Sequence, residues 1–110
     1  MGELELSRPF DSAVLRAVDE GLAVLGESVR DSIYYHLERS YGIRRDEVPE
    51  RLEAFHQALR GLLGEGGRTV EALIAKSLHG QLGLEFKGQP NCTLVEYVNR
   101  AKKLIGELKE

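Results

Sequence analysis

The sequence predicts an all-α fold, a compact bundle of about five short helices that forms a single domain over residues 1–110. Three observations carry this prediction. Apolar residues recur every three or four positions along five segments, which places them on one face of a helix. No segment of useful length alternates apolar and polar residues as a half-buried strand does. The 110 residues, 42% hydrophobic and 30% charged, also have the size and composition of one globular domain.

The first two helices are expected on either side of Gly26, which should end the first of them. The first stripe follows Pro9 and consists of Phe10, Val14, Val18, Leu22 and Leu25. Ser28 is placed to cap the second helix. The second stripe consists of Val29, Ile33, Leu37 and Tyr41. Gly42 followed by Ile43 is a stop signal, in which the glycine turns the chain and the isoleucine packs back.

The third and fourth helices are expected on either side of the glycine-rich stretch 64–67. Asp46 is predicted to cap the third helix, with Pro49 inside its first turn and Gly64 at its end. The third stripe has heptad-like spacing and consists of Val48, Leu52, Phe55, Leu59 and Leu62. Thr69 is predicted to cap the fourth helix. The fourth stripe consists of Val70, Ile74, Leu78 and Leu82, and Gly83 with Leu84 repeats the earlier stop signal.

The fifth helix is expected after a loop over residues 85–92, in which Phe86 turns inward. Thr93 and Glu96 form the best capping box in the chain. The fifth stripe consists of Leu94, Val98, Ala101, Ile105 and Leu108. As an alternative for part of the chain, the apolar pieces near Leu4 and at 84–86 could pair as a small ribbon.

Composition limits the classes of partner and compartment. A formal net charge of −3 opposes non-specific binding to phosphate backbones, so nucleic acid is not expected as a partner. Cys92 is the only cysteine, which excludes an internal disulfide and fits a reducing compartment. The acidic start, residues 1–5, lacks the features of a signal peptide, and no apolar run is long enough to span a membrane. The sequence therefore predicts a cytoplasmic protein with no membrane association.

Residues that could carry chemistry are scattered. His36, His56 and His79 lie on three different predicted helices, and no pair has the i, i+4 spacing of a helical metal grip. Cys92 precedes a helix, where a dipole can activate a thiol, but no histidine is near it in sequence. The loop 64–69 lacks the lysine and hydroxyl residue of a phosphate-binding loop. The sequence thus predicts no catalytic residue, no cofactor and no metal.

Contacts with another protein are better supported by the residues. Adjacent residues of a helix point about 100° apart, so Tyr34 and Tyr35 cannot both face the core. Three arginines follow within ten positions, although acidic residues lie directly after them. The candidate interaction surface consists of Tyr34, Tyr35, Arg39, Arg44 and Arg45. The expected partner is a second copy of the chain, as a homodimer, or another protein.

Much of the chain, from Val14 to Lys103, resembles a small archaeal family called the Nitrosopumilus output domain of the fifth type. The most specific stretches are Ile-Tyr-Tyr-His-Leu-Glu at 33–38 and the turn from Asp46 to Pro49. Residues 17–22, 25–30, 43–55, 59–67, 71–74 and 97–98 carry the rest of the likeness. The resemblance implies an archaeal source and a helical domain with a regulatory output role. It assigns no reaction, ligand or catalytic residue.

Three hypotheses of function follow, in order of preference. The first is a non-enzymatic interaction or regulatory module that self-associates, because the apolar helical faces exceed what a small monomer must bury. The second is a nucleic-acid-associated regulator that uses the segment from Arg39 to Arg45. The third is a small metal-binding or catalytic protein, which would require His36, His56 and His79 to converge.

Overall fold

The fold is given by a computed structural model, which describes the backbone of residues 2–109 and the side chains of residues 9–106. The helices are α1 (Gly2–Ala23), α2 (Glu27–Tyr41), the 3₁₀ helix η1 (Arg45–Glu50), α3 (Leu52–Leu63), α4 (Gly66–Gln81) and α5 (Leu94–Lys109). Helices make up 79% of the 110 residues, and the described residues include no strand, so the predicted all-α fold is confirmed. The alternative ribbon does not form, since Leu4 lies in α1 and residues 84–86 lie in a loop.

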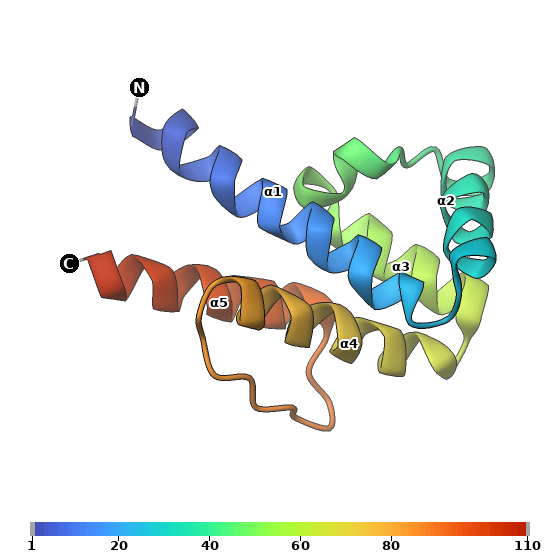
Figure 1. The fold of residues 1–110 in the computed structure, drawn as a ribbon. Helices are drawn as coiled ribbons and strands as arrows, with labels where there is room; N and C mark the ends of the chain where they lie inside the picture. Colours follow the sequence, from blue (N-terminus) through green and yellow to red (C-terminus); the bar gives the residue numbers. More distant parts are fainter. Residues whose placement is uncertain (1, 110) are drawn as a thin grey trace.

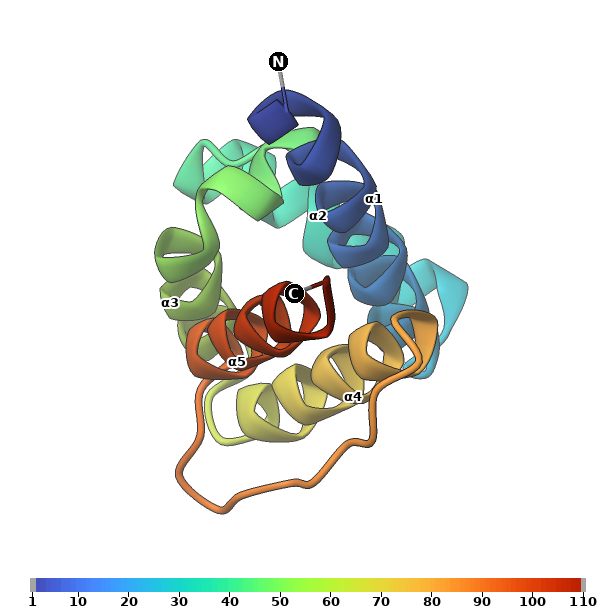
Figure 2. The same cartoon turned by 90° about the vertical axis from the view of Figure 1, so that its left-hand side faces the viewer.

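Helix α4 is the centre of the packing. It contacts α1, α3 and α5, while α2 contacts α1 and α3 at the edge of the bundle. Figures 1 and 2 show α4 and α5 side by side, with the start of α1 and the end of α5 on the same side of the molecule. The Cα radius of gyration is 13.6 Å, close to the value of about 13 Å for a compact chain of this length.

The core comes from the predicted stripes. Its largest fully buried apolar side chains are Leu22, Leu37, Ile43, Phe55, Leu59, Ile74, Leu78 and Leu94. The outer members of two stripes are not buried, because α2 reaches the core only through Ile33 and Leu37. Leu25, Val29 and Tyr41 are 39%, 41% and 40% exposed. Their assignment to core stripes was wrong, and it leaves apolar side chains on the surface.

The predicted helix ends are confirmed where a glycine takes a positive φ. Gly42 has a φ of 65°, and its N–H donates to the carbonyl oxygen of Glu38 at 3.1 Å. The N–H of Ile43 donates to the carbonyl oxygen of Leu37 at 3.0 Å, and the Ile43 side chain is buried. Two hydrogen bonds and one buried side chain thus satisfy the last carbonyls of α2.

The capping box of α5 is also confirmed. The N–H of Thr93 donates to Oε1 of Glu96 at 3.1 Å, and the N–H of Glu96 donates to Oγ1 of Thr93 at 3.2 Å. Phe86 turns inward as expected and lies between the rings of His79 and Tyr97. The loop before α5 is therefore held by Phe86 near its start and by the capping box at its end.

Several predicted helix starts are wrong. Helix α1 begins at Gly2 with Pro9 inside it, and α2 begins at Glu27, one residue before the expected cap Ser28. Helix α4 begins at Gly66, so Thr69 lies in its interior instead of capping it. The reason is close packing at Gly67, where a Cβ would lie 3.0 Å from Cδ of Arg60 and 3.4 Å from the carbonyl oxygen of Leu59. Packing against α3 here outweighs the weak helix propensity of glycine.

Asp46 does not cap α3 either. It lies in η1, and α3 begins only at Leu52. The N–H of Arg44 donates to Oε1 of Glu47 at 2.9 Å, and Glu47 returns a 2.9 Å hydrogen bond to the carbonyl oxygen of Arg44. These local bonds close a 3₁₀ turn, and Pro49, which has no N–H to donate, favours a break before the α-helix.

Candidate functional site

The predicted interaction surface divides into two parts. Tyr34 and Arg45 form the first part, and their side chains contact α1. Both bind the Asp19 carboxylate on α1. Oη of Tyr34 donates to Oδ1 of Asp19 at 2.5 Å, and Nε of Arg45 donates to the same oxygen at 3.0 Å. The Arg45 guanidinium also pairs with the other Asp19 oxygen. This cluster ties α2 and η1 to α1, which gives Tyr34 and Arg45 a structural role.

The electrostatics of this cluster are consistent with that role. Burial raises the pKa of the Asp19 carboxyl, and the hydrogen bonds from Arg45 and Tyr34 lower it. Together with the charge of Arg45 they outweigh burial, so the pKa of Asp19 lies below its ordinary value. Burial and the bond to Asp19 both raise the pKa of the Tyr34 hydroxyl, which keeps its proton on the donor. Asp19 is thus the charged acceptor of the cluster.

The other three predicted residues lie outside this cluster. Tyr35 is 53% exposed and its ring stands edge-on to His36, with ring centroids 5.4 Å apart. Arg39 is exposed and lines a surface hollow with Tyr35. Arg44 pairs with Asp46 at 3.1 Å, as the acidic residues after it suggested. Tyr35 and Arg39, together with the exposed Arg44–Asp46 pair, are therefore the parts of the predicted surface that stay available for contact.

A second surface surrounds the link between α1 and α2, and it includes Leu25 and Val29, which sequence reasoning assigned to core stripes. Val24 is 67% exposed, and Leu25 and Val29 are also exposed. A hollow of about 330 Å³ lies beside Val29 between α2 and α3, and its apolar wall includes Ile33, Leu62 and Leu63. These six residues form what we call the turn surface. In Figure 1 the α1–α2 link lies at the end of the molecule opposite the start of α1.

The turn surface combines protruding and recessed apolar parts. Val24 also borders a groove between α1 and α4, with Leu73 on its far wall. The exposed apolar side chains therefore lie beside two recesses, of which the α1–α4 groove is also lined by Glu20, Lys76, Ser77 and Gln81. Exposed apolar side chains that gather beside recesses in this way are typical of contact surfaces between proteins.

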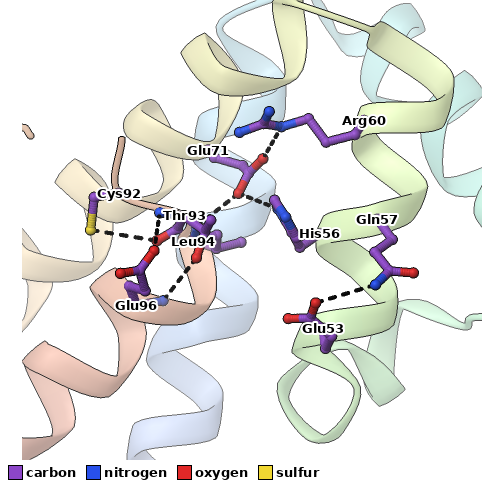
Figure 3. Close-up of polar contacts among 9 residues, drawn as sticks. All are labelled: Glu53, His56, Gln57, Arg60, Glu71, Cys92, Thr93, Leu94 and Glu96. Atoms are coloured by element: carbon purple, nitrogen blue, oxygen red, sulfur yellow. Dashed lines mark hydrogen bonds and ion pairs between the residues drawn. The ribbon is translucent and has the colours of Figure 1, made fainter. Parts of the chain in front are cut away.

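A buried carboxylate, which the sequence analysis missed, joins three helices. The Glu71 side chain on α4 is 1% exposed. Its Oε1 lies 2.7 Å from Nδ1 of His56, and its Oε2 accepts from Nε of Arg60 at 2.7 Å. The N–H of Leu94, the first residue of α5, donates to Oε1 at 2.8 Å. Figure 3 shows these partners converging on Glu71 from α3 and α5.

This cluster completes the start of α5. The capping box satisfies Thr93 and Glu96, but the N–H of Leu94 is buried and needs an acceptor from elsewhere. Glu71 supplies that acceptor, together with a negative charge at the positive end of the α5 dipole. The contacts of Glu71 with His56, Arg60 and Leu94 thus hold α3, α4 and α5 together.

One sequence signal could have found Glu71. Residues 71, 75 and 79 are four apart and follow the predicted stripe at 70, 74 and 78 by one position. All six are buried, because α4 packs against three helices instead of one. A polar residue in such a second stripe must have partners when it is buried. Glu71 and His79 are the two buried polar residues in the described part.

The histidines and Cys92 lie in unlike surroundings. His36 is exposed, His56 meets Glu71, and Nδ1 of His79 lies 2.7 Å from the carbonyl oxygen of Ala75. In the described ranges no three His, Cys, Asp or Glu side chains gather closely enough to hold a metal ion. Burial raises the pKa of the Cys92 thiol, which is the opposite of what a reactive cysteine at a helix start requires.

The glycine loop shrinks to Gly64 and Glu65, since the next two glycines belong to α4. Among residues 2–109, no helix combines the length and the apolar character needed to cross a bilayer. No protein-family model matches the chain, and no match was found among curated proteins or solved structures. The resemblance given above stays a prediction.

Proposed function

We propose that this chain is an interaction module that forms a homodimer through the turn surface. The observation that carries the proposal is the exposure of Val24, Leu25 and Val29 beside an apolar hollow. Burial of such side chains stabilises a complex by about 25 cal/mol for each Å² removed from water. A buried core assembled from apolar side chains is what a homodimer interface needs.

The choice of a second copy as partner rests on self-complementarity. In a two-fold symmetric dimer, each surface patch meets its own equivalent. Leu25 of one copy can therefore enter the hollow between α2 and α3 of the other, and the reverse contact follows by symmetry. Both the protrusion and the recess lie on the turn surface, and the hollow of about 330 Å³ has room for a branched side chain.

The nucleic-acid alternative gains no support from the arginines. Arg44 and Arg45 are paired with Asp46 and Asp19, which leaves Arg39 as the exposed cation of the predicted segment without an ion pair in the described residues. A regulatory output role, an archaeal source and a cytoplasmic location belong to the proposal on sequence grounds alone.

Light scattering at several protein concentrations tests the proposal. We expect the wild-type chain at high micromolar concentration to have twice the 12.3 kDa monomer mass. Leu25→Glu places a charge in the middle of the contact, at a position exposed enough for the monomer to fold, so it should give a monomer. Ser40→Glu adds the same charge on an exposed part of α2 outside the turn surface, and it should remain dimeric.

A wild-type chain that stays monomeric at high micromolar concentration would refute the proposal. A dimer that Leu25→Glu leaves intact would place the interface elsewhere. Circular dichroism of each variant separates a lost contact from a lost fold, since both variants should keep the helix content of the wild type.

A further inference from the structure

A hollow of about 370 Å³ lies between the end of α4, the α4–α5 loop and α5, away from the turn surface. That volume is at the small end of the range for small-molecule sites. Leu84 and Leu104 supply apolar wall, while Lys87 and Arg100 bring two cationic groups. Glu85 is the carboxylate on the wall, and His79 lies at the α4 side.

His79 presents an unused acceptor. Its side chain is buried, with a residue exposure of 3%. A carbonyl oxygen can only accept, so Nδ1 carries the proton in this bond, and in the uncharged tautomer that matches it Nε2 carries a lone pair. Nε2 has no hydrogen bond to another described residue, and His79 lines the hollow.

The walls of the hollow are held in place. Oη of Tyr97 accepts from the N–H of Gln89 at 2.8 Å and donates to its carbonyl oxygen at 3.2 Å. Arg100 donates to Oε1 of Gln89 at 3.0 Å, which fixes the guanidinium beside the hollow and leaves it further N–H groups. The Phe86 ring packs against His79 and Tyr97, with ring centroids 5.3 Å apart in each case. Arg100 and the loop at Gln89 should therefore lose little entropy on binding.

We propose that this hollow binds a small zwitterion, an α-amino acid with an apolar side chain. Its carboxylate would meet Arg100 and Lys87, and its ammonium group would donate to Nε2 of His79 and to Glu85. Its side chain would lie against the two leucines of the wall. This assignment uses every charged group of the wall, whereas a simple anion would face Glu85 and the lone pair of His79 without compensation.

Three probes of matched shape test the proposal on the full chain. L-Leucine carries both charged groups, 4-methylpentanoate lacks the ammonium group, and 3-methylbutylamine lacks the carboxylate. Ring ¹⁵N shifts of His79 report binding at Nε2 directly. We expect leucine to move the His79 signals in a saturable way, and each single-charge analogue to bind at least about tenfold more weakly.

Variants connect binding to the named groups. Arg100→Gln and Glu85→Gln should each weaken leucine binding about tenfold, because each removes one charged partner. Lys103→Gln removes a charge from an exposed position of α5 that does not line the hollow, and it should bind as the wild type does.

The proposal is overturned if leucine leaves the His79 signals unmoved up to about 20 mM, a weak limit for a ligand of this size. It is equally overturned if 4-methylpentanoate binds as tightly as leucine, since the ammonium group is then not recognised. Unchanged leucine binding in Arg100→Gln would show that the carboxylate lies elsewhere. Light scattering of the same variants keeps this result separate from the dimer, because no residue of the hollow belongs to the turn surface.

Discussion

Replacing Glu71 by alanine should be among the most costly single changes in this chain. The substitution removes the acceptor of three donors at the junction of α3, α4 and α5. Its main effect falls on the N–H of Leu94, which is buried and has no access to water. We therefore expect the loss of Glu71 to destabilise the first turn of α5 as well as the whole fold.

The size of the effect follows from the exposure of each partner. An unsatisfied buried N–H costs about 1–3 kcal/mol. The side chains of His56 and Arg60 are 15% and 32% exposed, so each can regain water, and each lost bond adds about 0.5–1 kcal/mol. The free energy of unfolding should fall by about 3 kcal/mol, and Tm by about 12 °C.

Denaturant unfolding followed by circular dichroism measures this loss, and amide hydrogen exchange at Leu94 locates it. Glu71→Gln keeps an oxygen for the Leu94 N–H but turns an amide group towards Arg60, so it should cost about 1–2 kcal/mol. Glu53→Gln, an exposed change on the same side of α3, should stay within about 0.5 kcal/mol of the wild type. A Glu71→Ala protein as stable as Glu53→Gln, with Leu94 exchange unchanged, would refute the reasoning.

Three further changes test other contacts. Gly21→Ala would put a Cβ 2.5 Å from Cγ1 of Ile74 and 3.0 Å from its backbone nitrogen, so thermal melting should show a loss of about 1–3 kcal/mol. Gly80→Ala, which meets nothing within 4 Å, should lose nothing in the same assay. Gly42→Ala forces a side chain into a φ of 65° and should cost about 1 kcal/mol in urea unfolding. The pKa of Asp19 in the folded chain lies below its ordinary value of 3.8. The ionised carboxylate therefore stabilises the fold above that pH, and this contribution is lost as pH falls through the folded pKa. The difference in free energy of unfolding between wild type and Asp19→Asn should shrink from pH 6 to pH 3.

The features that the sequence predicted correctly are governed by neighbouring residues. The stop at Gly42 needs a glycine and one apolar residue after it, and the box at Thr93 needs a glutamate three positions later. Both patterns lie within a few residues, so a single sequence contains all the information they require. The helix starts at Ser28, Asp46 and Thr69 were wrong because a possible cap is used only if the helix begins there. Packing of Gly67 against α3 accounts for the start of α4 before Thr69, whereas local hydrogen bonds in η1 account for Asp46.

The cluster at Glu71 shows the opposite case. Its partners come from positions 56, 60 and 94, and no local pattern connects them. The same applies to Asp19, whose partners Tyr34 and Arg45 were predicted as a contact surface. A charged residue in a helical sequence can face solvent or a distant partner, and periodicity does not distinguish the two. For Leu25 and Val29 the error was the opposite one, because they were predicted to be buried and are exposed. An apolar stripe indicates a contact face but does not say which molecule covers it.

That last ambiguity joins the two proposals. We propose that a second copy covers the apolar side chains that the described residues leave exposed at the turn surface. Nε2 of His79 has no hydrogen bond within the described residues, and this is why we propose a small molecule beside it. The two arguments share no residue, so Leu25→Glu should leave leucine binding unchanged and Arg100→Gln should leave the dimer intact. If instead leucine shifts the monomer–dimer equilibrium, the two surfaces are linked, and α4, the helix that packs against α1, α3 and α5, is the element through which that coupling would pass.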